Sequence, residues 1–460
     1  MKVLGERAIV IGGSMGGLLA ARALADAFEH VTLLERDEHP EHALPRKGVP
    51  QGRHLHGLLG RGREVLELFF PGITEDLVQQ GAMAGDLTEY CLWVNEGAPH
   101  VSFTSGLRGV VMSRPLIETT VRRRLLEWSN VEAINGVDVQ GLLTSLGGCR
   151  ITGVRSAPRG GDGEQELAAD LVVDACGRGS HSPAWLKALG YPAPPEDFVR
   201  TSLTYTTRVF QRRPGETAID GGDVPSVVCS GSTRTPRSGF MVPVEGDRWI
   251  VTLAGILGDE APTDLAGFLA FARSLPISDI YTLVSRAQPL DEGTQFKFPG
   301  SRRRRYEQLD RFPQRYLAFG DAICSFNPVY GQGMTVAATE ALELQYALAE
   351  GFDGLARRFF TRAAKAINVP WDMAVGSDLR FEGVEGHRIA RTRFVNWYVG
   401  KLHQAAWKDP VPAMAFQRVA NLLDSPAALL QPRVAWHVLH GNLAYRRSGQ
   451  GAAIRNSSPS

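Results

Sequence analysis

The chain has 460 residues, of which 43% are hydrophobic and 22% charged, and its formal net charge is +1. This length supports a large core in more than one structural unit, and the balanced charge argues against nucleic acid as a partner. No signal peptide precedes the first strand, no apolar run reaches the ~20 residues that span a bilayer, and the cysteines form no C-x-x-C pair. We therefore expect a cytoplasmic protein with reduced thiols.

The first forty residues carry a pattern typical of dinucleotide binding. An apolar run at Ala8–Ile11 leads into a glycine-rich turn and an Ala/Leu-rich helix, and a second run at Val31–Leu34 ends at Glu35. This arrangement predicts a strand–helix–strand unit with a pyrophosphate over the helix start and ribose hydroxyls on Glu35. Ser14 stands where the second glycine of G-x-G-x-x-G is expected, and its side chain makes the approach of the backbone to the pyrophosphate less free. The turn contains Gly12, Gly13, Ser14, Gly16 and Gly17.

Basic residues and histidines follow in a loop and in the next helix. Arg46 and Lys47 lie in a loop with Gly48 and Pro50, and Arg114 begins the helical segment "RPLIETTVRRRLLE". Pro115 suits the first turn of that helix. His54 and His56 have no third ligand nearby in sequence, so we expect packing or hydrogen bonding and no metal site.

Residues 181–300 differ from the segments around them. Ser202–Phe210 alternates like a half-buried antiparallel strand, and Gly239–Val244 with Trp249–Leu257 predicts a hairpin around Glu245-Gly246-Asp247. We expect another strand at Gly293–Phe298 and helices at Asp264–Leu275 and Ile277–Leu290, which together form a mixed sheet. The residues predicted to face inward are largely apolar, and core packing would explain them as well as a substrate pocket does: Tyr205, Phe210, Phe240, Met241 and Trp249.

The segment Phe319–Ala341 combines a Gly-Asp turn, a loop with Pro328 and a glycine-flanked helix start at Gly331 and Gly333. Free N–H groups and a positive dipole end at such a helix start favour a ligand that carries or develops negative charge. Before this segment, the run Arg302–Arg305 is predicted to be a solvated surface turn, with an attraction for the phosphates of NAD(P)H as a weaker alternative.

The chain is predicted to be helical from Leu342 onward. Its tryptophans are interpreted as core and helix-packing residues, because a sustained basic and apolar moment for membrane-surface binding is not evident. The tail at 449–460 is small and polar, and we expect it to be disordered. The tryptophans of the helical region after Leu342 are Trp371, Trp397, Trp407 and Trp436.

In order and spacing, these blocks resemble flavin-dependent monooxygenases of the para-hydroxybenzoate hydroxylase type (group A). Within that class, the chain is most similar to bacterial flavin epoxidases that act on polyene precursors of polyethers. The resemblance covers roughly the first 350 residues. Besides the two glycine segments, it rests on Leu44–Leu59 ("LPRKGVPQGRHLHGLL"), Met112–Glu118 ("MSRPLIE"), Ala169–Ser180 ("ADLVVDACGRGS") and Asp247–Gly255 ("DRWIVTLAG").

The resemblance implies an α/β fold: a Rossmann-like FAD-binding domain, an inserted mixed β-sheet substrate domain and a helical C-terminal region. We expect the FAD-binding domain at 1–180 and 300–350, the substrate domain at 181–300, the helical region at 351–448 and the disordered tail at 449–460. FAD would be the cofactor, with NAD(P)H as the reductant. The sequence is compatible with a monomer.

The resemblance also implies roles for individual residues. Arg114 would bind the pyrophosphate or ribityl side of FAD, Asp321 would accept hydrogen bonds from ribityl hydroxyls, and the loop before the second helix would touch the flavin's pyrimidine edge. One arginine near residue 46 would approach the flavin, although a solvated basic loop is an equal alternative. In the turn after Asp174, Cys176-Gly177 takes the place of an Asp-Gly pair that the aromatic hydroxylases link to NAD(P)H use, so the nicotinamide site is not located. The predicted cofactor residues outside the first turn are Glu35, Arg36, Arg46, Lys47, Arg114, Asp321, Pro328, Gly331, Gly333 and Met334.

The expected activity is insertion of one oxygen atom from O₂, through a C4a-hydroperoxyflavin, into a small hydrophobic substrate. Alkene epoxidation in natural-product biosynthesis is favoured, because epoxidation needs no general base and the inserted sheet offers no compelling one. An aromatic hydroxylase of the same class, a flavin halogenase and an FAD-dependent isoprenoid reductase are alternatives, and a non-enzymatic flavin-binding scaffold is a weaker one. The halogenase segment W-x-W-x-I-P is absent and Lys47 has a different context from the halogenase lysine.

Overall fold

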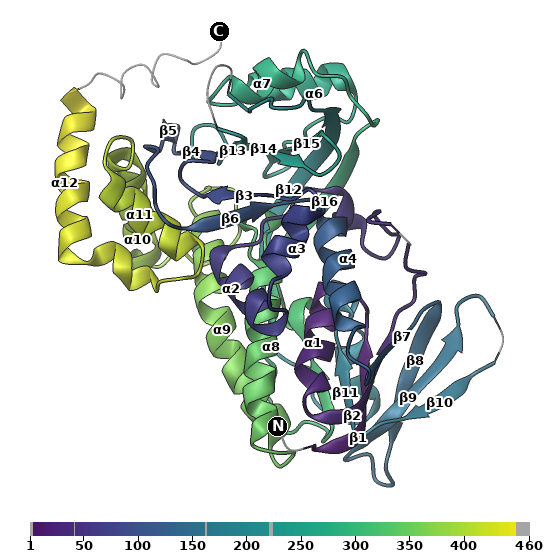
Figure 1. The fold of residues 1–460 in the computed structure, drawn as a ribbon. Helices are drawn as coiled ribbons and strands as arrows, with labels where there is room; N and C mark the ends of the chain where they lie inside the picture. The colour runs from purple at the N-terminus through teal and green to yellow at the C-terminus, as the bar shows by residue number, and fades with distance from the viewer. Residues whose placement is uncertain (1–2, 41, 162, 220–223, 448–460) are drawn as a thin grey trace.

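A parallel sheet of five strands forms around the amino-terminal strand in the computed structural model, which describes residues 3–40, 42–161, 163–219 and 224–447 (Figure 1). Its strand order is β17-β11-β1-β2-β7, and every neighbouring pair is parallel. The strands are apolar runs because both faces of the sheet are covered. Their bounds are Gly5–Ile11 (β1), Phe28–Leu34 (β2), Val131–Ile134 (β7), Leu171–Asp174 (β11) and Tyr316–Ala318 (β17).

Helices cover one face of this sheet and a small antiparallel sheet covers the other. Ala8 and Val10 pack with Leu18 and other helical residues, whereas Ile9 and Ile11 pack in a separate cluster with residues of the small sheet. The helices on the first face are α1 (Met15–Ala25), α2 (Gly60–Phe69), α3 (Ile73–Gln79), α4 (Arg114–Leu125), α8 (Gly333–Ala349) and α9 (Leu355–Asp378). The small sheet contains β8 (Val137–Thr144), β9 (Ile151–Pro158) and β10 (Gln165–Ala168).

A second large sheet has eight strands in the order β18-β16-β12-β15-β14-β13-β4-β5. The β13–β4 pair is parallel and the other pairs are antiparallel, so the predicted mixed sheet and its hairpin are confirmed. The sheet also recruits strands from outside residues 181–300. Its strands are β4 (Cys91–Asn95), β5 (Ala98–Pro99), β12 (Glu196–Gln211), β13 (Ser226–Cys229), β14 (Arg237–Val244), β15 (Arg248–Gly255), β16 (Thr294–Arg304) and β18 (Cys324–Ser325), and a separate pair is formed by β3 (Met83–Asp86) and β6 (Arg108–Val111).

Two helices, α6 (Leu265–Arg273) and α7 (Asp279–Val284), cover the outer face of the eight-stranded sheet (Figure 1). The side chain of Asp264 caps α6 by accepting a hydrogen bond from Gly267 N, which explains where the predicted helix begins. The second predicted helix is shorter than expected, since α7 ends at Val284.

The prediction that Arg302–Arg305 forms a solvated turn is wrong. Arg303 and Arg304 are buried at the end of β16, and their charges are paired with acids on neighbouring elements. Arg304 lies 2.9 Å from Glu196 and Arg303 lies 3.2 Å from Glu307. One acid close in sequence and one far away therefore allow these two arginines to enter the core.

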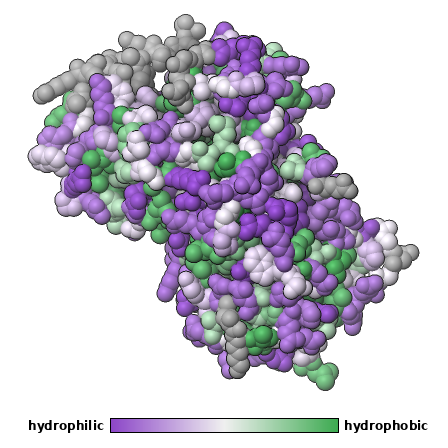
Figure 2. Space-filling model, in the orientation of Figure 1, coloured by the Kyte–Doolittle hydropathy of each residue, from purple (hydrophilic) through white to green (hydrophobic). Residues whose placement is uncertain are grey.

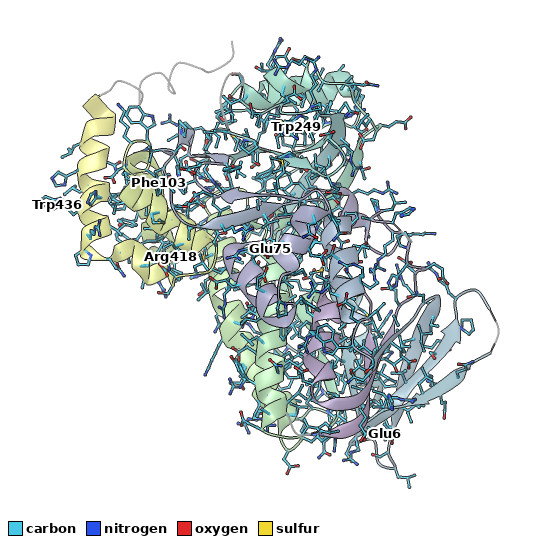
Figure 3. All side chains as sticks on the ribbon, in the orientation of Figure 1. Glu6, Glu75, Phe103, Trp249, Arg418 and Trp436 are labelled. Atoms are coloured by element: carbon cyan, nitrogen blue, oxygen red, sulfur yellow. The ribbon has the colours of Figure 1, made fainter. Side chains whose placement is uncertain are left out.

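The C-terminal region is helical, as expected, and contains α10 (Ala390–Ala405), α11 (Pro410–Ala420) and α12 (Pro432–Arg447). Trp371 is buried, but Trp397 and Trp436 are 59% and 63% exposed, so the packing interpretation is wrong for these two residues. Figure 3 shows that the Trp436 side chain extends outward from α12, away from the rest of the molecule. The predicted disordered tail lies outside the described residues. None of the described helices has the length and apolar character needed to cross a membrane.

Candidate functional site

The carboxyl ends of β1, β11 and β17 bring three glycine-containing turns together. Ile11 pairs with Asp174, and Asp174 pairs with Ala318. Beyond these residues, a Cβ on Gly320 would lie 3.9 Å from Gly16 Cα, and one on Gly177 would lie 3.7 Å from Asp321 Cβ. Segments more than 300 residues apart in sequence therefore meet at the edge of the parallel sheet, where ligands bind in open α/β sheets.

The first turn holds the acid predicted to bind ribose. Gly12 has a φ of 99°, and a Cβ on Gly17 would lie 1.7 Å from the Gly12 carbonyl oxygen, so both positions require glycine. Gly13 N donates a hydrogen bond of 2.7 Å to Glu35 Oε2. The turn and the end of β2 are thereby fixed against each other.

Ser14, the departure from the glycine pattern, connects the start of α1 to α4. Its hydroxyl donates to Glu118 Oε2 at 3.0 Å and accepts a hydrogen bond from Arg114 Nη2 at 3.0 Å. A glycine could make neither bond. The serine therefore orients Arg114 toward the turn that precedes α1.

Glu118 is the centre of a buried charge cluster that the sequence analysis did not predict. Its carboxylate lies 2.9 Å from each of Arg46, Arg114 and Arg122. Although burial opposes ionisation, the three guanidinium groups lower the Glu118 pKa to about 2. The spacing of Arg114, Glu118 and Arg122 at i, i+4 and i+8 places them on one face of α4 and could have identified this cluster.

The side chain of Arg46 is buried, whereas its neighbour Lys47 and the predicted cofactor residue Arg36 are exposed. Arg46 lies 2.9 Å from Glu35 Oε2, which excludes the alternative that it belongs to a solvated loop. Its Nη2 atom is buried and has no hydrogen-bond partner among the described residues. A buried, unpaired guanidinium nitrogen beside a glycine turn and a helix start fits the oxygen-rich pyrophosphate of a dinucleotide.

Asp321 lies in the third turn, beside the start of α8. A Cβ on Gly333, the first residue of α8, would lie 3.9 Å from Asp321 Oδ1. The Asp321 carboxylate is open to solvent on one side. The surrounding protein nevertheless limits its hydration and raises its pKa to about 6, although the positive charges of Arg178 and Arg114 act in the opposite direction. It is thus an accessible acceptor at the edge of the turns.

The loop before α8 is held in place by the end of α9. Asn327 Nδ2 and the Tyr330 hydroxyl each donate to Asp378 Oδ1 at 2.8 Å. Gly331 has a φ of 65° and ends the short 3₁₀ turn of Pro328–Tyr330, while Met334 is buried. These bonds fix the backbone that leads to the N–H groups of α8. Asp378 was not predicted from the sequence.

Glu340 on α8 supports the Asp321 turn from beneath. It is fully buried, its Oε2 accepts a hydrogen bond of 2.8 Å from Gly320 N, and its Oε1 has no partner among the described residues. Burial raises its pKa to about 8. Glu340 is therefore largely protonated at neutral pH.

We expect Glu340→Gln to flatten the dependence of stability on pH. Because the folded-state pKa lies above the unfolded value, the folded state binds more protons between about pH 4.5 and pH 8, and stability falls as pH rises through that range. The free energy of unfolding in urea should fall between pH 5 and pH 8, and this fall should be about 3 kcal/mol smaller in the variant. If the pH dependence of stability is the same in Glu340→Gln and the natural protein, Glu340 is not the group that causes it. Glu343→Gln, on the same helix but with a less buried side chain, is the control.

Strand alternation divides the predicted substrate residues between two faces of the large sheet. Tyr205 and Phe240 lie in an apolar cluster with Leu203, Ala254 and Phe298, against which Val329 of the loop before α8 packs. Phe210, Met241 and Trp249 instead pack in the core beneath α6 and α7; Figure 3 shows Trp249 there. The structure therefore brings only the first two toward the loop.

His54 is a buried polar residue beside this apolar cluster. Its Nδ1 lies 2.8 Å from Thr207 Oγ1, which lies 2.6 Å from Thr252 Oγ1, and Thr252 accepts a hydrogen bond from Leu55 N. Burial lowers the His54 pKa to about 4, so the ring is neutral. Nε2 has no partner among the described residues.

His56 and Asp174, which the sequence analysis also noted, make hydrogen bonds within the protein. His56 Nδ1 contacts the His54 carbonyl oxygen at 3.0 Å, and burial lowers its pKa to about 3. Asp174 is buried and accepts hydrogen bonds from Ser180 and Ser182 at 2.6 Å and 2.5 Å. No cluster of metal ligands occurs in the described part of the chain.

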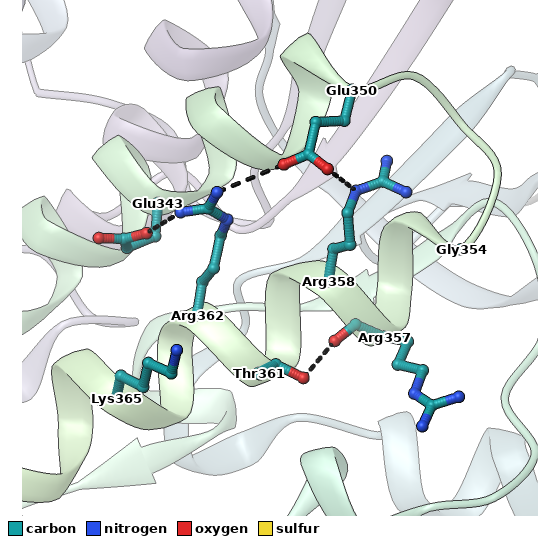
Figure 4. A pocket seen from close by; sticks show the side chains of 8 residues that line it. All are labelled: Glu343, Glu350, Gly354, Arg357, Arg358, Thr361, Arg362 and Lys365. Atoms are coloured by element: carbon teal, nitrogen blue, oxygen red, sulfur yellow. Dashed lines mark hydrogen bonds and ion pairs between the residues drawn. The ribbon is translucent and has the colours of Figure 1, made fainter.

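A surface groove between α8 and α9 lies apart from these residues (Figure 4). In it, Arg362 bridges Glu343 and Glu350, and Arg358 also pairs with Glu350. It contains none of the predicted cofactor or substrate residues. Its lining consists of Glu343, Glu350, Gly354, Arg357, Arg358, Thr361, Arg362 and Lys365.

The chain is 36% identical over 440 residues to Protein Rv3254 of Mycobacterium tuberculosis (strain ATCC 25618 / H37Rv), covering 91% of this chain and 90% of that protein. It belongs to the family of Protein Rv3254. Kynurenine 3-monooxygenase of Salinispora arenicola (strain CNS-205) is 32% identical over 181 residues, which cover 37% of this chain and 36% of that enzyme. No protein-family model matches the sequence.

Solved structures of flavoproteins share the fold. The flavin-dependent brominase Bmp2 matches with a TM-score of 0.66 at 12% identity, over 98% of this chain and 100% of that one. The structure of pqsL, a probable FAD-dependent monooxygenase from Pseudomonas aeruginosa, matches with a TM-score of 0.59 at 15% identity, over 82% and 99% of the two chains. The predicted fold class is confirmed.

Proposed function

We propose that this protein is an FAD-dependent monooxygenase that uses NAD(P)H and O₂. The observation that carries the proposal is the convergence of the Gly12–Gly17 turn, the Ser14–Arg114–Glu118 contacts and the start of α8 at one edge of the parallel sheet. That convergence occurs in a chain whose fold matches a probable FAD-dependent monooxygenase. A partial sequence match to a kynurenine 3-monooxygenase supports the same enzyme class.

The residues at this edge suit the parts of FAD in order. The N–H groups at the start of α1, with Arg114 and the unpaired nitrogen of Arg46, would hold the pyrophosphate, and Glu35 would hold the adenosine ribose. Asp321 would accept hydrogen bonds from the ribityl hydroxyls. Bound FAD would supply the transfer of electrons from NAD(P)H and the activation of O₂.

The start of α8 has a further task at the flavin ring. Its first N–H groups and its dipole would stabilise negative charge on the pyrimidine side of the reduced ring. The bonds from Asn327 and Tyr330 to Asp378 hold these groups in position before the ligand arrives. We assign cofactor binding to residues 1–180 and 300–350 and substrate binding to 181–300, with β4, β5 and β18 completing the substrate sheet.

We propose a small hydrophobic substrate and favour epoxidation of an alkene. The cluster around Tyr205 and Phe240 is apolar, and the neighbouring His54 is neutral, with a buried Nε2 that has no partner among the described residues. The same burial raises the Tyr205 pKa above its ordinary range, so this phenol does not serve as a base at neutral pH. Epoxidation requires no deprotonated substrate, whereas phenol hydroxylation benefits from a base. The unpartnered Nε2 of His54 would form one hydrogen bond with a polar group on an otherwise apolar molecule.

Halogenation is a second candidate, because the brominase Bmp2 has the same fold over nearly the whole chain. Lys297, the lysine between Phe296 and Phe298 of the apolar cluster, is exposed and pairs with Glu260 at 2.6 Å, and Lys47 is exposed as well. These placements favour oxygen insertion.

Purified protein incubated with FAD should retain a flavin absorption band after gel filtration. With a reductant and a panel of polyene, isoprenoid and aromatic compounds under ¹⁸O₂, we expect a product with one labelled oxygen. A halogen in the product would support the halogenase, and added hydrogen without oxygen would support a reductase. Absence of retained flavin would contradict all of these enzyme assignments.

A further inference from the structure

The C-terminal helices expose an unusual amount of apolar side chain. Eight of the twenty exposed large hydrophobic residues in the described chain lie between residues 389 and 443. Green residues are visible among hydrophilic ones over this part of the surface in Figure 2. Isolated exposed residues of this kind are ordinary, but a concentration that includes two tryptophans indicates a binding surface. The eight are Ile389, Phe394, Val395, Trp397, Leu430, Trp436, Leu439 and Leu443.

These residues form stripes on helices whose other sides are already packed. On α12, Trp436, Leu439 and Leu443 are spaced i, i+3 and i+7, while Val434 and Val438 are buried against α10 and α11. On α10, Phe394 and Trp397 are exposed and have ring centroids 5.9 Å apart, whereas Leu402 further along the helix is buried. The exposed stripes are therefore additional to the core of the helical region.

The charges around the stripes are almost entirely positive. Residues 386–447 contain nine arginines and lysines but only two acids, Asp409 and Asp424. Both acids are paired within the region, Asp409 with His437 at 2.7 Å and Asp424 with Arg418 at 2.7 Å. The exposed side chains of Arg391, Arg393 and Arg433 make no ion pair within the described chain, and we call these three residues together with the eight apolar ones the α10–α12 surface.

We propose that the α10–α12 surface binds a membrane surface that contains anionic lipid. Tryptophan, phenylalanine and leucine enter the boundary between headgroups and acyl chains, and adjacent arginines bind lipid phosphates. A second copy of the chain is a poorer occupant, because a two-fold contact would set arginines against arginines, and both acids of residues 386–447 are already paired. No helix needs to cross the bilayer for this mode of binding.

The α10–α12 surface is connected to the proposed substrate sheet. His403 of α10 lies 3.1 Å from His100, next to β5, and Val101 N donates to the Ala406 carbonyl oxygen at 2.8 Å. The helices thus hold the β4–β5 end of the sheet near the lipid. A substrate dissolved in the membrane would meet the enzyme on this side; this last step rests on the proposed function, whereas lipid binding does not.

Flotation of the full-length protein with vesicles tests the proposal. We expect binding to vesicles of phosphatidylcholine mixed with phosphatidylglycerol and much weaker binding to phosphatidylcholine alone. The double variant Trp397→Gln/Trp436→Gln should reduce binding about tenfold or more, and the triple variant Arg391→Gln/Arg393→Gln/Arg433→Gln should reduce it roughly 100-fold at about 100 mM salt. Because all five side chains are exposed, the variants should fold, which circular dichroism and urea unfolding would verify.

Matched controls lie elsewhere on the surface. Tyr346→Gln removes an exposed aromatic residue from α8, and Arg357→Gln/Lys365→Gln removes two exposed cations from α9. Neither control should change flotation. Equal loss in controls and test variants, or no binding to anionic vesicles, would overturn the proposal and leave an acidic protein as the partner to seek. A dimer in solution that the tryptophan variant dissociates would also overturn it, in favour of a second copy. Flavin retention is measured separately, so failure of lipid binding is distinguishable from failure of the proposed function.

Discussion

The variant Asp321→Ala should bind FAD about 10- to 100-fold more weakly than the natural protein. A carboxylate that accepts hydrogen bonds from ligand hydroxyls contributes roughly 1.5–3 kcal/mol, and alanine leaves those hydroxyls without this acceptor. Asp321 is accessible at the edge of the three glycine turns, beside the start of α8, so its removal should disturb little of the fold. Titration of flavin fluorescence gives the dissociation constant. Asp372→Ala removes an exposed carboxylate from α9 and should leave it unchanged.

The same residue predicts how FAD binding depends on pH. The pKa of Asp321 is raised to about 6, and only the deprotonated carboxylate accepts hydrogen bonds at both oxygens. Binding should therefore weaken as pH falls through 6. The apoprotein's stability should respond oppositely, since a raised pKa favours the protonated folded state below that pH. The variant Asp321→Asn should remove most of this pH dependence of FAD binding. The Asp378 carboxyl also has a pKa of about 6, so Asp378→Asn is the comparison. If Asp378→Asn removes the pH dependence and Asp321→Asn does not, the loop before α8 controls FAD binding.

Local signals in the sequence were sufficient to predict the elements of the cofactor half. The apolar run of β1, the glycine turn, the helix and Glu35 lie within thirty residues, so spacing alone determines their arrangement. Glu118 and Asp378 could not be assigned in the same way. The spacing on α4 indicates only the pairs of Glu118 with Arg114 and Arg122. Its contact with Arg46 spans 72 residues, and the contacts of Asp378 with Asn327 and Tyr330 span 51 and 48, which a single sequence does not reveal.

In the substrate half, the sequence pattern predicts the strands but not which face of the large sheet contacts a ligand. Because helices cover one face of the large sheet and the loop before α8 the other, both faces are apolar, and hydrophobicity does not reveal which one meets a ligand. Strand alternation does separate them: Tyr205 and Phe210 are an odd number of positions apart, and Phe240 and Met241 are adjacent, so neither pair can share a face. The tryptophans of α10 and α12 pose the same problem in helices, where a buried and an exposed stripe are both apolar.

Replacing Glu118 with glutamine should destabilise the apoprotein by about 3–5 kcal/mol. Glu118 is the shared partner of three buried arginines, and removing one member of a buried charge network leaves the others without compensation. Urea unfolding measures the loss. Glu127→Gln is the matched control: this glutamate follows the same helix and pairs with Arg123 at 3.4 Å, but both side chains are at least half exposed, so the expected change is below 1 kcal/mol.

The response to pH and to FAD separates this charge effect from a simple packing defect. Because the Glu118 pKa is lowered to about 2, its contribution is complete above the unfolded value of about 4.5 and is lost as pH falls toward 2, so the variant and the natural protein should converge in acid. FAD should restore part of the variant's stability at neutral pH, since its pyrophosphate would neutralise guanidinium groups that Glu118 no longer pairs. A deficit that persists unchanged at pH 3 and with saturating FAD would contradict the assignment. The cluster would then serve to pack α4 against α1, with no part in receiving the pyrophosphate.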